Sequence, residues 1–237
     1  MDIFISPKKV VLILTRVVLV LTLLSLSGIF YKYFFFEGQE RYLVNIFNLD
    51  KETNFPTWYA ALSLMICSTL LLIISAAKRK SNDRYFYYWF FLGIIFLLLA
   101  TDEMVQLHEQ VITPIRNVLN TTGYLYITWI IPAVILGIVF LGAYFKFLIH
   151  LPRNYRILFV TSGVIYILGA IGLEIIGSNH IYYYGQKNIS YDLITTVEEL
   201  LEMVGVLLFI YTLLSYLCVE LPNLRISFRD NDSSSAV

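Results

Sequence analysis

Charged residues are scarce in this chain of 237 residues, and its formal net charge is zero. Asp, Glu, Lys and Arg make up 14% of the sequence, against about 25% in soluble domains. Hydrophobic residues make up 58%, and the mean hydropathy is +0.72. These values are typical of a membrane protein, and the absence of net charge excludes a bulk attraction to nucleic acid.

Cysteine is nearly absent, since the chain holds only Cys67 and Cys218. Both lie in apolar segments at opposite ends of the expected topology, which argues against a disulfide or a thiolate metal site. No lysine lies in the middle of an apolar run, which argues against a retinal protein. A glycine-rich phosphate loop and the His-Glu-x-x-His and Glu-x-x-His metal motifs are also missing. Glu198-Glu199 is followed by Met203 where membrane-embedded CAAX-type proteases have arginine, so that family is excluded too.

Long apolar runs are what the sequence does have, and each approaches the roughly 20 residues that cross a bilayer core. They predict an all-α, polytopic membrane helix bundle of six transmembrane helices. The expected spans lie at about 10–30, 57–77, from 85 into the stretch 102–109, 124–149, 155–177 and 193–218. We expect one transmembrane domain over residues 1–223 and a disordered cytoplasmic tail over 224–237. A cleavable signal peptide is the rival interpretation of the first run, but that run contains Arg16 and continues past Ser27.

The distribution of Lys and Arg predicts the orientation. One side of the six-span topology holds Lys8, Lys9, Lys78, Arg79, Lys80, Arg84, Lys146, Arg153, Arg156, Arg225 and Arg229, and the other holds Lys32, Arg41, Lys51, Arg116 and Lys187. This bias of eleven to five predicts that both termini lie in the cytoplasm. We expect a multi-pass protein of the cell (inner or plasma) membrane whose partners are membrane lipids, with no nucleic acid. A homo-oligomer is an open alternative.

Acidic residues recur near the outer ends of three of these spans. At 1.5 Å per residue from the cytoplasmic end of its span, Asp102 lies roughly 26 Å up and Glu174 roughly 29 Å. Glu202 and Glu198 lie roughly 24 and 30 Å up by the same measure. A hydrocarbon core is about 30 Å thick, so the four acids occupy one layer just inside its outer boundary. An ionisable group inside a membrane needs a partner and marks a functional site.

The helical period also groups these acids by face. Glu198 and Glu202 are four residues apart and share a face, which Gly205 continues. On the fifth span, a stripe of small residues is expected beside Glu174, comprising Gly163, Ala170 and Gly177. Asp102 and Glu109 also share a face but lie about 10 Å apart along the axis, too far for one ion unless the helix breaks between them.

A solvated helix end is the alternative interpretation of the same acids. Thr195 and Glu198 fit a capping box at the start of the sixth span. Acids in the first turns also suit the helix dipole, and Glu199 is expected to face water. His108 alone is more often a surface histidine than a ligand. Glu174 fits this alternative least well, because apolar residues surround it on both sides.

Three motifs together resemble an uncharacterised family of multi-pass microbial membrane proteins. They are Asp102-Glu103 with His108-Glu109, then Gly172-Leu173-Glu174, then Glu198-Glu199-Leu200-Leu201-Glu202-Met203. The resemblance covers roughly the third to sixth spans. It implies no activity, but it supports treating the motifs as one unit.

The sequence therefore predicts a cluster of carboxylates and histidine near the outer membrane face. The expected ligands are Asp102, Glu174, Glu198, Glu202, His108 and Glu109. Like charges cannot share a dry layer unless a cation or protons neutralise them, so we expect the cluster to bind a divalent cation of unspecified identity, or protons. One alternative is a membrane-embedded, metal-dependent hydrolase acting at the outer leaflet. The other is a structural membrane protein with no site.

Overall fold

The computed structural model describes residues 6–39 and 41–222, and all regular structure in that part of the chain is helical. Six helices are long and apolar enough to cross a membrane. They are α1 (Pro7–Phe35), α3 (Phe55–Lys80), α4 (Phe86–Val105), α7 (Ile130–His150), the continuous segment Arg153–Tyr184, and α10 (Ile189–Glu220). The shorter elements are α2 (Tyr42–Asn45), α5 (Leu107–Gln110), α6 (Ile112–Leu119) and the 3₁₀ turn η1 (Gly123–Leu125). The expected tail, 224–237, lies outside the described residues.

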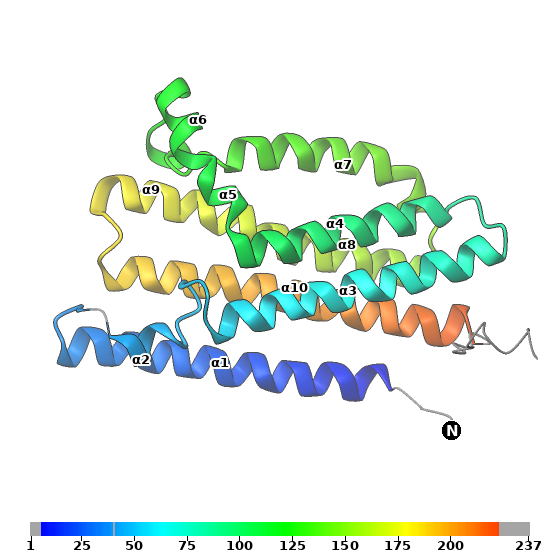
Figure 1. The fold of residues 1–237 in the computed structure, drawn as a ribbon, viewed down its shortest axis with the longest axis horizontal. Coiled ribbons are helices and arrows are strands. Elements are labelled where there is room, and N and C mark those ends of the chain that lie inside the picture. The colour runs from blue at the N-terminus through cyan, green and yellow to red at the C-terminus, as the bar shows by residue number, and fades with distance from the viewer. Residues whose placement is uncertain (1–5, 40, 223–237) are drawn as a thin grey trace, which may run out of the picture.

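The long helices run side by side as a bundle, with α10 at its centre (Figure 1). α10 contacts α1, α3 and both halves of the Arg153–Tyr184 segment. The described chain ends, Ser6 and Pro222, lie at one end of the bundle, here called the proximal end. The opposite end, here called the distal end, carries α2, α5, α6 and the connection from α9 to α10 (Figure 1).

The segment Arg153–Tyr184 is not a regular α-helix throughout. α8 (Arg153–Ile167) passes into a π-helical turn, η2 (Leu168–Leu173), and then into α9 (Glu174–Tyr184). A π turn adds one residue to a helix and rotates everything after it, and such turns occur frequently at functional sites. Glu174 is the first residue after this turn. α9 continues past 177, where the fifth span is predicted to end from the sequence, and it carries His180.

Glycines set the spacing between the π turn and α10. A Cβ atom at Gly169 would lie 2.8 Å from the backbone oxygen of Glu198 and 2.9 Å from Cγ of Glu202. A Cβ atom at Gly205 would lie 2.8 Å from the backbone nitrogen of Tyr166. Only glycine permits this approach, which brings the acids of α10 against η2. The expected stripe of small residues was wrong at Gly163, where a Cβ atom would meet nothing within 4 Å, because the π turn rotates that residue away from Glu174.

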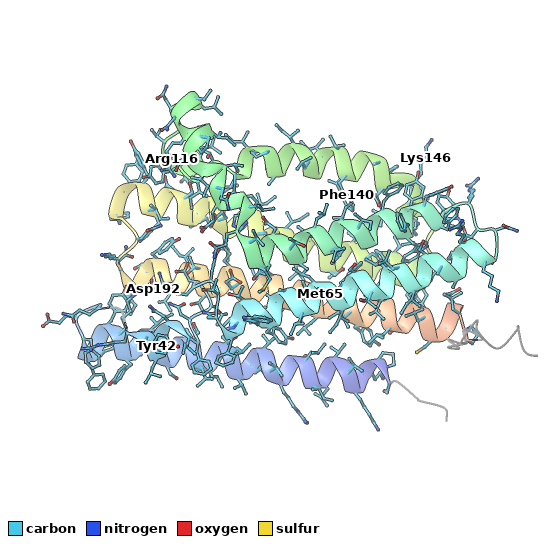
Figure 2. The ribbon with its side chains drawn as sticks, in the orientation of Figure 1. Tyr42, Met65, Arg116, Phe140, Lys146 and Asp192 are labelled. Carbon is cyan, nitrogen blue, oxygen red and sulfur yellow. The ribbon has the colours of Figure 1, made fainter. Side chains whose placement is uncertain are left out.

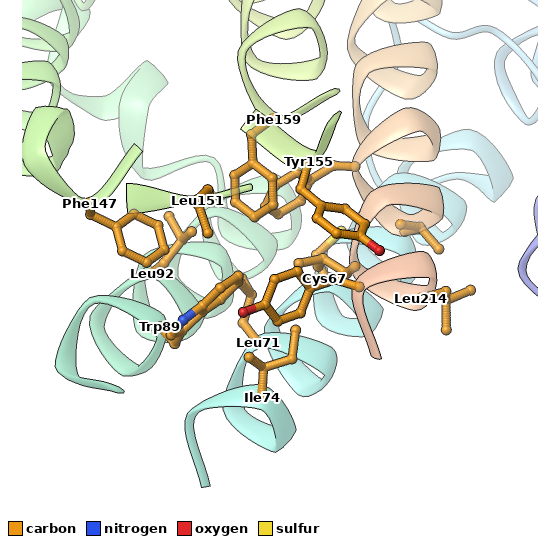
Figure 3. Packing of buried hydrophobic residues seen from close by; sticks show 14 of the residues in the cluster. Cys67, Leu71, Ile74, Trp89, Leu92, Phe147, Leu151, Tyr155, Phe159 and Leu214 are labelled. Carbon is orange, nitrogen blue, oxygen red and sulfur yellow. The ribbon is translucent and has the colours of Figure 1, made fainter. Parts of the chain in front are cut away.

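Aromatic and aliphatic side chains fill the bundle towards the proximal end (Figure 3). Trp89 is 1% exposed and its ring lies 5.1 Å from Phe147 and 4.9 Å from Tyr216, measured between ring centroids. Phe159 packs edge-on against Trp89 at 5.7 Å. Aromatic pairs in this range of distances add to the stabilisation that burial gives. This apolar cluster joins α3, α4, α7, α8 and α10 below the acids.

A buried ion pair connects the first and last long helices. Nζ of Lys32 on α1 lies 2.9 Å from Oδ2 of Asp192 on α10, and the two residues are 5% and 4% exposed. Figure 2 labels Asp192 at the distal half of α10. The sequence placed Lys32 in the loop after the first span and started the last span near Leu193. Both boundaries were wrong, since α1 continues to Phe35 and α10 begins at Ile189.

Candidate metal centre and carboxylate layer

The centre begins where α4 ends. Gln106 adopts a left-handed conformation, with φ of 60°, and its backbone N–H donates to the carbonyl of Asp102 at 2.7 Å. The helix therefore breaks between Asp102 and His108, and α5 starts in a new direction. The backbone N–H of His108 donates to Oδ1 of Asp102 at 3.0 Å, and Nδ1 of its ring lies 2.7 Å from Oδ2. The break thus folds the histidine back onto the aspartate.

Two carboxylates join this histidine. Glu52, His108 and Glu109 each offer one ligand atom, and these atoms all lie within 4.8 Å of one another. In residues 6–39 and 41–222 this is the one group of three or more His, Cys, Asp or Glu side chains with that geometry. Because Asp102 holds Nδ1 of His108, Nε2 is the ring nitrogen left to face a ligand.

Glu52 comes from the connection between α2 and α3, and side-chain hydrogen bonds hold that connection in place. Nδ2 of Asn54 donates to the carbonyls of Asn45 and Asn48 at 2.9 and 2.7 Å. Oδ1 of Asn54 accepts from the backbone N–H of Thr57 at 3.1 Å and so caps α3. The backbone N–H of Leu49 donates to Oγ of Ser25 on α1 at 3.1 Å. Glu52 is therefore delivered by an ordered turn.

The charges of this centre perturb one another. Burial, together with the negative charge of Glu109 and against the opposing effect of His108, raises the pKa of Glu52 to about 7. Burial lowers the pKa of His108, but the hydrogen bond and charge of Asp102, aided by Glu109 and Glu52, outweigh it and leave that pKa above its ordinary value. A cation that binds Glu52 and His108 must displace the protons that these groups hold near neutral pH.

A cavity of about 130 Å³, here called the distal cavity, adjoins these residues. His108, Glu109, Trp129, Glu174 and Tyr191 line it. Nε1 of Trp129 donates to Oε1 of Glu174 at 2.9 Å, and the ring of Trp129 lies 5.0 Å from that of His108. Glu174 therefore faces the same space as the histidine.

Arg116 supplies a positive charge at the rim of the distal cavity, and Figure 2 labels it beside the distal connections. Its Nε donates to the carbonyl of Tyr126 at 2.9 Å, and its guanidinium lies 3.7 Å from the centroid of the Tyr126 ring. These two contacts fix the orientation of the guanidinium.

Glu198 lies one step deeper. It is 8% exposed, and its Oε2 has no hydrogen-bond partner within the described residues. Its strongest charge interactions are with Glu174 and Glu202. A buried carboxylate oxygen without a partner carries a desolvation cost and requires an explanation.

A second, water-sized cavity of about 10 Å³ lies beside these acids and is here called the inner cavity. Glu103, Glu199, Glu202, Tyr59 and Tyr166 are among the residues that line it. Glu202 interacts with Glu103 and with the hydroxyl of Tyr166. Glu199, which the sequence expected to face water, is half-buried and lines this cavity.

The structure divides the six residues that the sequence singled out. His108 and Glu109 belong to the distal group, and Asp102 supports that histidine. Glu174, Glu198 and Glu202 form a second group that is connected electrostatically. We call this second group, together with Glu103 and Glu199, the inner acids. Whether any of these residues binds a metal stays a prediction.

Sequence reasoning missed Glu52, Glu103 and Glu199. Glu103 and Glu199 stand beside residues that were singled out, and only the direction of their side chains distinguished them. Glu52 carries no signal in the sequence, because its role depends on how the loop folds back. The capping box was also wrong: Asn188 caps α10 with Oδ1 accepting from the backbone N–H of Tyr191 at 2.9 Å.

Comparison with known proteins identifies the family of this chain, and that family has no assigned function. The family model described as "Domain of unknown function (DUF8692)" matches residues 11–217. The match extends well beyond the third to sixth spans, from which the sequence motifs came. Neither a search of curated proteins nor one of solved structures found a match.

Proposed function

The chain belongs to this uncharacterised family, and from the geometry of its distal end we propose that it is a membrane protein that binds a divalent cation through Glu52, His108 and Glu109. The observation that carries the proposal is the approach of the three ligand atoms to within 4.8 Å of one another. Ligand bonds of about 2.0–2.6 Å place two ligands of one ion at most about 4–5 Å apart. The group is therefore of the right size for one ion.

The contact between Asp102 and the ring of His108 supports the proposal. A metal-binding histidine almost always donates its other ring N–H to a carboxylate or carbonyl, which fixes the tautomer and the ring direction. Asp102 is placed to accept that proton from Nδ1 of His108, at 2.7 Å. Asp102 is then a positioning residue rather than a ligand.

The donor set indicates the class of metal. Ca²⁺ and Mg²⁺ prefer oxygen ligands alone, whereas imidazole suits Zn²⁺ and other transition metals. One imidazole and two carboxylates, from His108, Glu52 and Glu109, favour Zn²⁺ or Mn²⁺. The raised pKa values of Glu52 and His108 make the site dependent on pH, since protons compete for the same atoms.

The distal end lies at the outer face of the membrane in this proposal. The excess of Lys and Arg on the proximal side and the positive-inside rule support that orientation, with both termini in the cytoplasm of a cell membrane. Membrane lipids surround the helices.

Binding is favoured over transport. A transporter needs polar groups at the midplane and an exit on the other side. Below the acids the described helices are joined by the apolar cluster around Trp89 and Phe147.

Titration calorimetry on the purified, chelator-treated protein in detergent tests the cation site. We expect the wild type to bind Zn²⁺ or Mn²⁺ with one site per chain, and Glu52→Gln and His108→Ala to lose that binding. Asp102→Asn should weaken it by about 10–100-fold, as losses behind a metal ligand do. Glu220→Gln is the matched control, because Glu220 is exposed at the proximal end. Binding by Glu52→Gln that equals the wild type would refute the proposal, as would a wild type that binds neither ion.

A metal-dependent hydrolase at the outer leaflet is the second candidate, and the distal cavity favours it. That cavity adjoins two of the three proposed ligands, His108 and Glu109, and holds the oriented guanidinium of Arg116 at its rim. A bound divalent cation supplies Lewis acidity and an activated water. Incubating the metal-loaded protein with vesicles of defined phospholipids, and analysing the lipids by mass spectrometry, tests it. Products that appear with the wild type and not with His108→Ala would support hydrolysis, and unchanged lipids would exclude it for those substrates.

A further inference from the structure

Glu198, Glu199 and Glu202 have other carboxylates as their strongest electrostatic neighbours. Glu198 responds most to Glu174 and Glu202, and Glu199 responds most to Glu202 and Glu103. His108 opposes this repulsion at Glu202, but neither Lys nor Arg is among the leading influences on these groups, and the buried Lys32 is paired with Asp192. Carboxylates crowded in a dry layer cannot all be ionised at once.

From this crowding, and from the partnerless Oε2 of the buried Glu198, we infer that the inner acids hold protons and exchange them with the distal cavity through Glu174. This function goes beyond the cation site, because it requires no metal. The ligand is the proton, and the source and acceptor of each proton is water in the distal cavity.

The placement of the acids defines a path. Glu174 lines the distal cavity and interacts electrostatically with Glu198. Glu202 follows Glu198 one helical turn later on α10. Glu202 in turn lines the inner cavity with Glu103 and Glu199. One water fits in about 10–15 Å³, so the inner cavity has room for a single bridging molecule.

The path ends within the bundle. Leu64 and Val206 line the inner cavity and also belong to the apolar cluster that continues towards the proximal end. The inner acids therefore form a store of protons and not a channel across the membrane.

A second metal fits these residues less well than protons do. Within the described chain, the inner acids do not bring three ligand atoms within 4.8 Å of one another, as Glu52, His108 and Glu109 do. The inner cavity is too small for a hydrated divalent ion. A proton neutralises a single carboxylate, whereas a metal ion needs several oxygen ligands around it.

Infrared spectroscopy on the detergent-solubilised protein, with chelator and no added metal, tests the inference. At about pH 8, about one unit above the pKa of Glu52, most of that side chain is ionised and contributes little. We expect the wild type still to show the C=O stretch of protonated carboxyl groups. The double variant Glu198→Gln/Glu202→Gln should lose roughly half of the band or more, while Glu220→Gln keeps it. Thermal unfolding of each variant verifies that it is folded.

The proposed opening has its own test. In D₂O the carboxyl band shifts as protons exchange for deuterons, and exchange through Glu174 should be at least about tenfold slower in Glu174→Leu. A wild type without the band at about pH 8 would overturn the proton store. A band that exchanges equally fast in Glu174→Leu would overturn the route. Neither result bears on the cation site, which is measured with added metal and fails through Glu52 and His108.

Discussion

Replacing Gly169 with alanine tests the close approach on which the inner acids depend. The added methyl carbon would lie 2.8 Å from the backbone oxygen of Glu198 and 3.2 Å from the backbone nitrogen of Glu202. Real Cβ atoms do not make contacts as short as 2.8 Å, and a backbone atom of α10 cannot yield without moving the helix. Overpacking of this kind costs about 1–3 kcal/mol.

Gly163→Ala on the same helical segment is the matched control. Its Cβ atom would meet nothing within 4 Å. Replacing glycine with alanine within a helix also stabilises it by about 1 kcal/mol. Both variants share that gain, so the difference between their unfolding free energies isolates the cost of overpacking. We therefore expect Gly169→Ala to be less stable than Gly163→Ala by about 1–3 kcal/mol.

Equilibrium unfolding in mixed micelles, with increasing denaturing detergent, measures that difference. The wild type, both variants and a chelator-treated sample of each are compared under one condition. If Gly169→Ala unfolds with the same free energy as Gly163→Ala, α10 does not lie against the π turn. The arrangement of Glu174, Glu198 and Glu202 derived from it would then be wrong.

Three further outcomes follow from the same structure. Lys32→Met leaves Asp192 as an unpaired buried charge and should destabilise the protein by about 3–5 kcal/mol, while Lys32→Met/Asp192→Leu recovers much of that loss in the same assay. Because folding raises the pKa of Glu52 from 4.5 to about 7, the folded state holds the extra proton between these values. The stability of the metal-free protein should therefore fall as pH rises across that window, and Glu52→Gln should flatten the slope in thermal unfolding. A reporter fused after Val237 should read cytoplasmic, and a signal from the other side would reverse the proposed orientation.

Much of the fold could be predicted from hydrophobicity alone. Six apolar runs of bilayer length became six long helices, because a span must satisfy its backbone internally wherever it lies. The ends were predicted less well, since Lys32 and Asp192 read as loop residues until they are seen to neutralise each other across the bundle. Polar residues at helix ends gain partners that only the tertiary structure provides.

The candidate site was predicted in part, for a similar reason. Helical rise placed Glu174, Glu198 and Glu202 at one depth, and the structure connects them electrostatically. The break at Gln106 could not be predicted, because a left-handed residue other than glycine has little sequence signature. That break brings His108 back to Asp102.

The other part of the site depends on long-range contacts. Glu52 lies on a loop, and its approach to the histidine is a product of the whole fold. The π turn before Glu174 likewise shifts the faces that a regular helical period predicts.

The ion pair between α1 and α10 joins two residues that are made far apart in time during biosynthesis. Lys32 is synthesised 160 residues before Asp192, so in the proposed membrane topology the first helix would enter the bilayer with a charge whose partner does not yet exist. That charge must stay at the interface, or with the insertion machinery, until the last helix arrives. A chain cut short before α10 would lack the carboxylate that pairs with Lys32 in the complete protein. The last helix therefore completes the protein electrostatically as well as by packing.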